Sequence, residues 1–319
     1  MRDLNATLDQ STIENLQCKL PLLGATLIST DDADLRRYLS FYQLPQPNNR
    51  LTLYAERITM GGNHIVTMAW QPSNSIGTAL VVHGYMDHIG LFNHLIQDLL
   101  KRQLTVVCFD LPGHGLSTGR PGYILDYAEY VSVLELVIDI SQEKFRGPLH
   151  GVGQSMGGAI LLKHSIESYT NNNSDYPFVS LNLFAPLLQP KGWNINRWLH
   201  LLAKSFIEDR ARVFRHSSWD EEFLFFLRYC DPLQAKLMPI AWVGALKKWI
   251  QEFKQFKGSN LAINLIQGDA DKTLDWETNL GIFKQKFSAL NVHIIKDGNH
   301  HLVNEVESMR AEIFSALRF

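Results

Sequence analysis

The sequence of 319 residues predicts one α/β domain, a mostly parallel, doubly wound sheet with an antiparallel N-terminal hairpin and helices on both faces. Three observations predict this fold class. Short apolar runs alternate with segments of helical periodicity from residue 78 onward. Gly61-Gly62 separates two runs of strand character. Ser155 stands between two glycines where an apolar run leads into a helical segment.

The N-terminal part predicts a helix and then the hairpin. Residues 31–44 carry apolar side chains at helical spacing behind a candidate N-cap, either Asp31 or Asp32. These apolar positions are Leu35, Tyr38, Leu39 and Tyr42. Residues 51–60 and 63–70 flank the two glycines and predict two antiparallel strands at an edge of the sheet.

The rest of the chain predicts repeated strand-helix units. Strands are expected over residues 78–84, 104–110, 148–154, 179–185, 261–267 and 291–296. Helices are expected over residues 90–102, 123–144, 156–170, 275–289 and 302–318. Because helices between successive strands serve as crossovers in parallel sheets, this alternation predicts a parallel sheet covered on both faces.

One segment interrupts the alternation. Residues 187–258 separate two expected strands by about seventy residues, too many for a plain connection in a compact domain. They carry twelve Lys and Arg against seven Asp and Glu, and five of the seven tryptophans. The tryptophans are Trp193, Trp198, Trp219, Trp242 and Trp249. We therefore expect an inserted helical lid on a core formed by residues 1–186 and 259–319.

Two interpretations of the lid composition stay open. The aromatic and cationic side chains can serve a membrane surface from which an enzyme draws acyl chains. Alternatively, the aromatics form the lid's own small core and the cations a solvated face. The sequence favours neither.

The strongest candidate for chemistry is Ser155, in Gly153-Gln154-Ser155-Met156-Gly157. Glycines on both sides allow a turn too tight for side chains, and such a turn lifts a serine hydroxyl clear of the sheet. The same pattern also occurs in packed turns without a catalytic role. The assignment therefore depends on partners elsewhere in the chain.

Candidate partners follow the ends of other expected strands. The strand near residue 78 ends in His83-Gly84, so the backbone N–H groups of Tyr85 and Met156 are expected to form an oxyanion hole. Farther along, an Asp-rich turn and then a pair of histidines each follow a strand. Because the carboxyl ends of parallel strands meet at one edge of a sheet, this order predicts a Ser-Asp-His triad.

As a set, these motifs resemble the α/β-hydrolases of the lysophospholipase and monoacylglycerol lipase-like group, which is often filed with the serine aminopeptidases. The resemblance spans roughly residues 50–319 and rests on the elbow and four other motifs. These are His83-Gly84-x-x-x-His88, the segment 109–120 with Asp110-x-x-Gly113-His114-Gly115, Gly268-x-x-Asp271, and His300 followed by Asn304-Glu305. The segment Asp231-Pro232-Leu233-Gln234 is similar to the lid of the bacterial lysophospholipase L2 type.

The resemblance implies the α/β-hydrolase fold and selects Asp271 and His300 as the acid and base. Asp269 and His301 remain the alternatives. His83, Asp110 and His114 are expected to brace loops, and Asp87 and His88 to lie at the pocket mouth or at a solvated helix start. The bulk of the Tyr85 side chain is expected to narrow the acyl site.

Composition limits the partners and cofactors. A formal charge of −2 without a basic run argues against nucleic acid. No zinc spacing or phosphate-binding loop is present, so no metal and no cofactor is expected. Three separated cysteines predict a reducing compartment and hence a cytoplasmic protein. Neither a cleaved signal peptide nor a transmembrane span is expected.

The expected function is hydrolysis of carboxylic esters of monoacyl lipids, lysophospholipids or monoacylglycerols, through an acyl-enzyme on Ser155. The expected partner is a small lipid or ester, with peripheral membrane contact through the lid as an open possibility. One alternative is a serine aminopeptidase-type peptidase, although proline iminopeptidases resemble His-Gly-Gly-Pro-Gly where this chain has His83-Gly84-Tyr85-Met86-Asp87. A general soluble esterase and a catalytically silent binding protein are the others.

Overall fold

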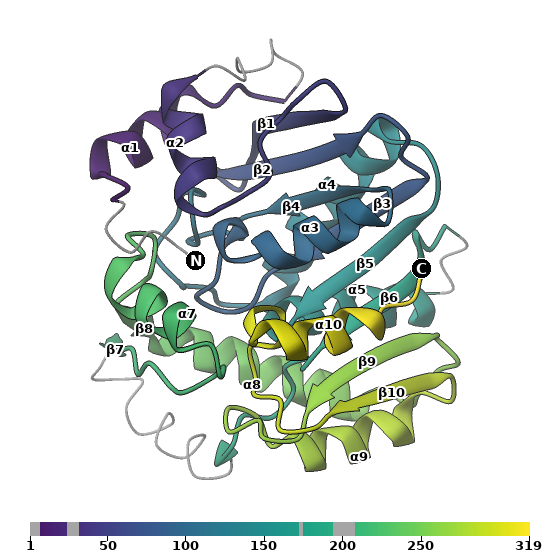
Figure 1. The fold of residues 1–319 in the computed structure, drawn as a ribbon. Helices are drawn as coiled ribbons and strands as arrows, with labels where there is room; N and C mark the ends of the chain where they lie inside the picture. Colours follow the sequence, from purple (N-terminus) through teal and green to yellow (C-terminus); the bar gives the residue numbers. More distant parts are fainter. Residues whose placement is uncertain (1–6, 24–31, 172–174, 194–207) are drawn as a thin grey trace.

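A computed structural model describes residues 7–23, 32–171, 175–193 and 208–319. Its centre is an eight-stranded sheet in the order β1-β2-β4-β3-β5-β6-β9-β10 (Figure 1). The strands are β1 (Leu51–Met60), β2 (Asn63–Pro72), β3 (Gly77–Val82), β4 (Leu104–Phe109), β5 (Leu149–Gln154), β6 (Phe178–Phe184), β9 (Ile263–Gly268) and β10 (Leu290–Ile295). The six strands from β3 to β10 in this sheet run parallel, whereas β2 is antiparallel to both β1 and β4. The predicted fold class and hairpin are confirmed.

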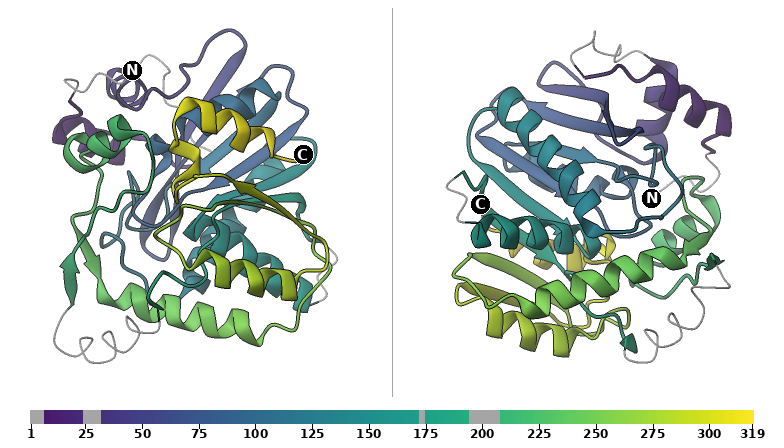
Figure 2. Two further views of the ribbon diagram at one scale, coloured as in Figure 1. Left: turned by 60° about the horizontal axis from the view of Figure 1, so that its bottom comes forward. Right: turned by 180° about the vertical axis from the view of Figure 1, so that it is seen from behind.

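Helices cover both faces of the sheet (Figures 1 and 2). One hydrophobic core joins α1 (Gln10–Lys19), α2 (Ala33–Phe41), α3 (Asn93–Lys101) and α10 (Glu307–Ser315) to one face. A second core joins α4 (Tyr127–Lys144), α5 (Met156–Thr170), α8 (Ile240–Gln255) and α9 (Trp276–Lys286) to the other. These two layers hold the strand ends in place, and the strand ends position the candidate site.

Capping and short turns move the predicted helix boundaries. Asp32 is the N-cap of α2, since its side chain accepts from the N–H groups of Asp34 and Leu35; Asp31 lies outside the described residues. A 3₁₀ turn, Ile89–Leu91, precedes α3. Residues 302–318 were expected as one helix, which was wrong, because a 3₁₀ turn at Leu302–Asn304 precedes α10. Helix α1 had no counterpart among the expected elements.

The segment between β6 and β9 has structure of its own. Its described part contains β7 (Asp209–Ala211), α7 (Glu221–Phe225), a π-helical turn (Phe226–Cys230), β8 (Leu237–Pro239) and α8. We call residues 187–258 the insertion. Helix α8 packs in the same hydrophobic core as α4 and α5. Phe223 and Phe226 belong to the core on the other face of the sheet. The insertion therefore contacts both layers of the domain.

In the described part of the insertion, the tryptophans do not form a separate small core. Trp193, Trp242 and Trp249 are buried in the same core as α4 and α5. Trp219 is 46% exposed, and Trp198 lies outside the described residues. Within the described ranges, no helix combines the length and apolar character needed to cross a membrane.

Candidate active site

Ser155 joins β5 to α5 in an unusual backbone conformation, with φ 52° and ψ −112°. A residue with a side chain is strained there, and such strain is typical of a nucleophile elbow. The Ser155 N–H donates to Phe184 O at 2.8 Å, and the Leu187 N–H donates to Ser155 O at 2.9 Å. These two hydrogen bonds hold the elbow against the end of β6.

The two glycines of the elbow are required by close backbone contacts. A Cβ at Gly153 would lie 2.6 Å from the amide nitrogen of Gly158. A Cβ at Gly157 would lie 2.0 Å from Val82 O and 2.7 Å from His83 O. The elbow is therefore pressed against the end of β3, where the loop containing Tyr85 begins.

The structure brings Ser155, His300 and Asp271 into one hydrogen-bonded chain. His300 Nε2 lies 2.9 Å from Ser155 Oγ, and His300 Nδ1 lies 2.8 Å from Asp271 Oδ2. Asp271 follows β9 and His300 follows β10, so both come from strand ends. When Nδ1 carries the ring proton and donates to Asp271, Nε2 is free to accept from the serine hydroxyl.

Asp271 is held as a carboxylate. Burial alone raises its pKa, but the adjacent His300 and the N–H groups of Leu274 and Thr273 bring the pKa of Asp271 below its ordinary value. These N–H groups donate to Oδ1 at 3.0 Å and 2.7 Å, whereas Oδ2 faces His300 and also accepts from Gln267 Nε2 at 3.2 Å. The carboxylate is therefore both ionised and oriented toward the imidazole.

The alternative acid and base lie elsewhere. Asp269 is exposed, and its Oδ1 accepts from the N–H of Asp297 at 2.6 Å. His301 Nε2 lies 3.2 Å from Asp87 Oδ2. Neither Asp269 nor His301 has a hydrogen bond to Ser155 within the described ranges.

Tyr85 lies in a tight turn after β3. The Asp87 N–H donates to Gly84 O at 3.2 Å, and Met86 has a φ of 65°. Among the residues that the structure describes, the Tyr85 N–H has no hydrogen-bond acceptor. Met156 is the first residue of α5, where backbone N–H groups have no partner within the helix. Both predicted donors are thus available next to the elbow.

The neighbouring loops are braced by buried polar side chains, as expected. His83 Nε2 accepts from the Leu111 N–H at 3.0 Å. Burial lowers the pKa of His83 to about 3, which keeps the ring neutral. Asp110 accepts from the N–H groups of Ile89 and Leu116 at 2.7 Å and 2.8 Å. Burial lowers the pKa of His114, which contacts Pro112 O at 2.9 Å, to about 4.

Two further His–Asp pairs flank the turn and were missed by sequence reasoning. His301 pairs with Asp87, and His88 Nε2 lies 2.9 Å from Asp231 Oδ2. Asp87 and His88 were expected either at the pocket mouth or at a solvated helix start, and the second alternative is wrong, because their side chains are 7% and 0% exposed. The partners are separated by 214 and 143 residues, so no local pattern in the sequence indicates either pair.

The Tyr85 side chain packs on the insertion. Its ring stacks on Trp242 with centroids 3.9 Å apart and an interplanar angle of 14°. Its hydroxyl donates to Gly122 O at 3.0 Å. The ring is thus fixed between the core and α8, and the insertion supports the turn that contains Tyr85.

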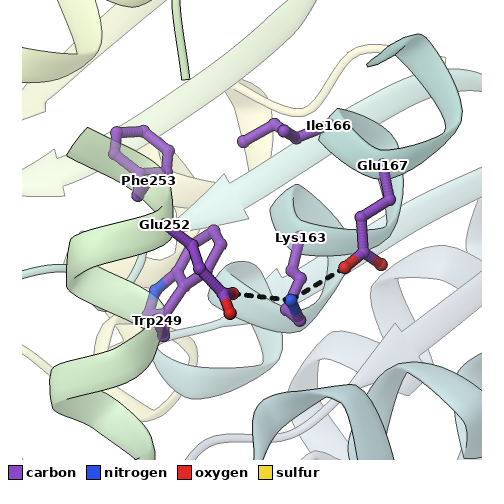
Figure 3. A pocket seen from close by; sticks show the side chains of 6 residues that line it. All are labelled: Lys163, Ile166, Glu167, Trp249, Glu252 and Phe253. Carbon is purple, nitrogen blue, oxygen red and sulfur yellow. Dashed lines mark hydrogen bonds and ion pairs between the residues drawn. The ribbon is translucent and has the colours of Figure 1, made fainter. Parts of the chain in front are cut away.

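A cavity of about 170 Å³ lies between α5 and α8, away from the triad (Figure 3). Lys163 Nζ lies there 2.8 Å from Glu167 and 2.7 Å from Glu252, whose side chains point toward it (Figure 3). The Lys163 side chain is 6% exposed. This arrangement links the insertion to the core two turns of helix beyond Ser155.

A model of the family "Serine aminopeptidase, S33" matches residues 73–307. A monoacylglycerol lipase of Mycolicibacterium smegmatis is 31% identical over 33% of this chain and 38% of its own. The phospholipase YtpA of Bacillus subtilis is 24% identical over 78% of this chain and 96% of its own. The rat monoglyceride lipase is 28% identical over 41% and 42%. The match thus spans about two fifths of the two lipases.

Solved structures show the same fold. A soluble variant of monoglyceride lipase from Saccharomyces cerevisiae matches with a TM-score of 0.70 and 16% identity, over 85% of this chain and 96% of its own. The monoacylglycerol lipase of Paleococcus ferrophilus matches with a TM-score of 0.63 and 19% identity, over 79% and 99%. The match therefore covers nearly the whole of both solved chains.

Proposed function

The chain belongs to the serine aminopeptidase S33 family of α/β-hydrolases, and we propose that it hydrolyses carboxylic esters of monoacyl lipids through an acyl-enzyme on Ser155. The observation that carries the proposal is the buried hydrogen-bonded chain from Ser155 through His300 to Asp271. Three relatives named as monoacylglycerol lipase, monoglyceride lipase or phospholipase support a monoacyl glycerolipid or lysophospholipid as the substrate class.

The geometry supports each proton transfer of this mechanism. A serine hydroxyl is a weak nucleophile at its free pKa, so His300 Nε2 takes the Ser155 proton as the hydroxyl oxygen attacks the acyl carbonyl. Asp271 holds the imidazole tautomer and stabilises the imidazolium that forms. His300 then gives the proton to the leaving glycerol oxygen, and the acyl-serine remains.

The second half repeats the sequence with water. His300 takes a proton from water, the hydroxide attacks the acyl-serine, and the fatty acid leaves as the proton returns to Ser155. In both halves the negative charge develops on the former carbonyl oxygen. We assign its stabilisation to the N–H groups of Tyr85 and Met156, and loss of one such donor typically costs about 10²-fold to 10³-fold in kcat.

A peptidase of the aminopeptidase type is the second candidate, because the matching family carries that name. An aminopeptidase needs a carboxylate to receive the substrate ammonium group. Among the described residues, the buried carboxylates beside residues 83–88 already have partners: Asp87 and Asp231 are each paired with a histidine, and Asp110 accepts from the N–H groups of Ile89 and Leu116. This pairing favours the esterase.

We also propose that the insertion contacts a lipid surface. Phe225 and Tyr229 are 47% and 65% exposed, and their rings lie 5.1 Å apart. Arg228 is exposed between them in the chain, and its guanidinium carbon lies 5.2 Å from the centre of the Tyr229 ring. Apolar rings beside an exposed cation suit the headgroup region of an anionic membrane.

One experiment tests the catalytic proposal. A fluorophosphonate probe, a panel of p-nitrophenyl esters of graded chain length and an aminoacyl p-nitroanilide are offered to the wild-type protein and to Ser155→Ala. We expect labelling and ester hydrolysis by the wild type, little anilide cleavage, and neither reaction in a Ser155→Ala protein with an unchanged Tm. Ester hydrolysis by folded Ser155→Ala would refute the mechanism, and preferred anilide cleavage would favour the peptidase.

A further inference from the structure

We infer that Asp231 of the insertion is a positioning residue for the oxyanion turn, residues 83–88, and that it acts through His88. The inference rests on the proposed function, in which the backbone N–H of Tyr85, a residue of this turn, stabilises the oxyanion. It adds that the insertion holds part of the catalytic apparatus in place.

Asp231 is the centre of a buried network. Its Oδ2 lies 2.9 Å from His88 Nε2, and both side chains are 0% exposed. The Tyr42 hydroxyl donates to Oδ1 at 2.7 Å, and Gln234 Nε2 donates to Oδ2 at 2.9 Å. The Leu233 N–H also donates to Oδ1, at 3.1 Å. One carboxylate thus joins the C-cap residue of α2, the oxyanion turn and the insertion.

Each partner of this pair shifts the pKa of the other toward the charged form. Burial alone raises the pKa of Asp231, but His88 and the hydrogen bonds from Tyr42 and Gln234 bring that pKa below its ordinary value. Burial alone lowers the pKa of His88, but Asp231, with Asp110 and Asp87 nearby, raises it above its ordinary value. A buried charge that loses its partner is strongly destabilised, so the two side chains hold each other in position.

The oxyanion turn is anchored at both sides of its tip. On one side, His83 Nε2 accepts from the N–H of Leu111. On the other, Asp87 pairs with His301 and the next residue, His88, pairs with Asp231. Tyr85 lies between these anchors. Because an oxyanion donor must be placed before the charge develops, loss of an anchor is expected to lower turnover more than ground-state binding.

The insertion side of the network is also fixed. Arg212 is the residue that follows β7, and its Nη1 donates to Gln234 Oε1. The backbone N–H of Arg212 donates to Lys236 O at 2.9 Å. On the core side, the Tyr42 ring fills the space beside Gly90, where a Cβ would lie 2.6 Å from the ring. A displacement of residues 231–236 would therefore be transmitted to His88 rather than absorbed by a loose contact.

The test compares Asp231→Asn with the wild type on a short soluble p-nitrophenyl ester. Ser155-dependent turnover of the wild type is established first, so that a failure of the proposed function is recognised separately. We expect kcat to fall about tenfold to a hundredfold, within the loss caused by removing one oxyanion donor, and KM to change less than about threefold. The control is Glu252→Gln, which breaks the ion pair between α8 and Lys163 away from the turn. Its kcat should stay at the wild-type value.

A double-mutant cycle separates positioning from general destabilisation. If Asp231 acts through His88, the variant with both His88→Asn and Asp231→Asn should lose no more kcat than the worse single variant. The inference would be overturned if the kcat losses of the two single variants multiplied in the double variant. It would also be overturned if Asp231→Asn kept the wild-type kcat, or if Glu252→Gln lost as much kcat as Asp231→Asn. Should Asp231→Asn fail to fold, Tyr42→Phe removes one donor to the same carboxylate and keeps the ring. It should lower kcat severalfold at unchanged KM, and wild-type kcat in that variant would count against the inference.

Discussion

Gly157 lies so close to Val82 that a Cβ on the glycine would stand 2.0 Å from the Val82 carbonyl oxygen. The contact joins the first turn of α5 to the end of β3. It therefore brings Met156, at the start of the helix, next to the loop that carries Tyr85. This close approach is one of the contacts that set the spacing of the two proposed oxyanion donors.

We expect Gly157→Ala to lower both stability and turnover. The added methyl group meets backbone atoms, which cannot rotate away, so α5 must shift from β3 at a cost of about 1–3 kcal/mol. The shift separates the two donors and should lower kcat for a soluble ester. The measurements are urea unfolding and steady-state kinetics.

Gly281→Ala in α9 is the control, because nothing lies within 4 Å of a Cβ there, and alanine should stabilise that helix by up to about 1 kcal/mol. Equal behaviour of the two variants would contradict the prediction.

Asp271→Asn should lower kcat by about four orders of magnitude, as the corresponding change does in serine proteases, because the amide favours the wrong imidazole tautomer. Asp269→Asn should have a small effect, since Asp269 only accepts a hydrogen bond from the Asp297 N–H in an exposed turn. Steady-state turnover of one p-nitrophenyl ester measures both. A larger loss in Asp269→Asn would reverse the assignment of the acid.

The parts of this structure that the sequence predicts well are those set by local pattern. The hairpin around Gly61-Gly62 pairs Met60 with Asn63, as the spacing of the two runs requires. The candidate Ser155, Asp271 and His300 each follow a strand, and parallel topology alone brings such ends together.

The contacts that sequence analysis missed depend on long-range packing. Nothing near His88 indicates that its partner is 143 residues away. The break in the last helix has a similar cause. The Glu305 carboxylate accepts from the N–H groups of Asn299 and Trp219 at 2.7 Å each, which stabilises a non-helical turn before α10. Such contacts depend on which segments the fold brings together, and the hydrophobic periodicity of the sequence does not indicate them.

Asp110 should make stability depend on pH. Burial raises its pKa to about 6, above the ordinary value of 3.8. At a pH between these two pKa values, Asp110 is therefore protonated in the folded chain and ionised in the unfolded chain. Its contribution to stability is fully present below about pH 4 and is lost as the pH rises through 6, by roughly 3 kcal/mol in total.

Asp110→Asn does not titrate, so the comparison isolates this group. The unfolding free energies of the wild type and the variant are measured by urea denaturation at each pH. Their difference, wild type minus variant, should decrease as the pH is raised from 4.5 to 7.5. The variant should also be less stable at pH 4.5, because its amide nitrogen cannot accept from Ile89 or Leu116. A difference that is constant with pH, or that grows, would show that Asp110 titrates normally.

The proposed lipid contact predicts a dependence on vesicle charge. Activity on a long-chain monoacyl lipid should be higher in anionic than in neutral vesicles, and added salt should remove the difference by screening. Arg228→Glu and the pair Phe225→Ser with Tyr229→Ser should weaken vesicle binding in a flotation assay. Hydrolysis of a short soluble ester should stay unchanged, because these side chains are exposed and distant in the chain from the strand ends that carry the triad.

The choice of cation matters for this test. Reversal of Lys247 and Lys248 in α8 would also probe the charge of the insertion, but Lys248 is ion-paired with Asp126, the N-cap of α4. Lys248→Glu therefore breaks a contact with the core and serves as a control for structural damage. If neutral and anionic vesicles support equal rates at low salt, and Arg228→Glu binds vesicles as the wild type does, the exposed rings and cations form only a solvated surface. The enzyme would then be a soluble esterase whose insertion supports the oxyanion turn.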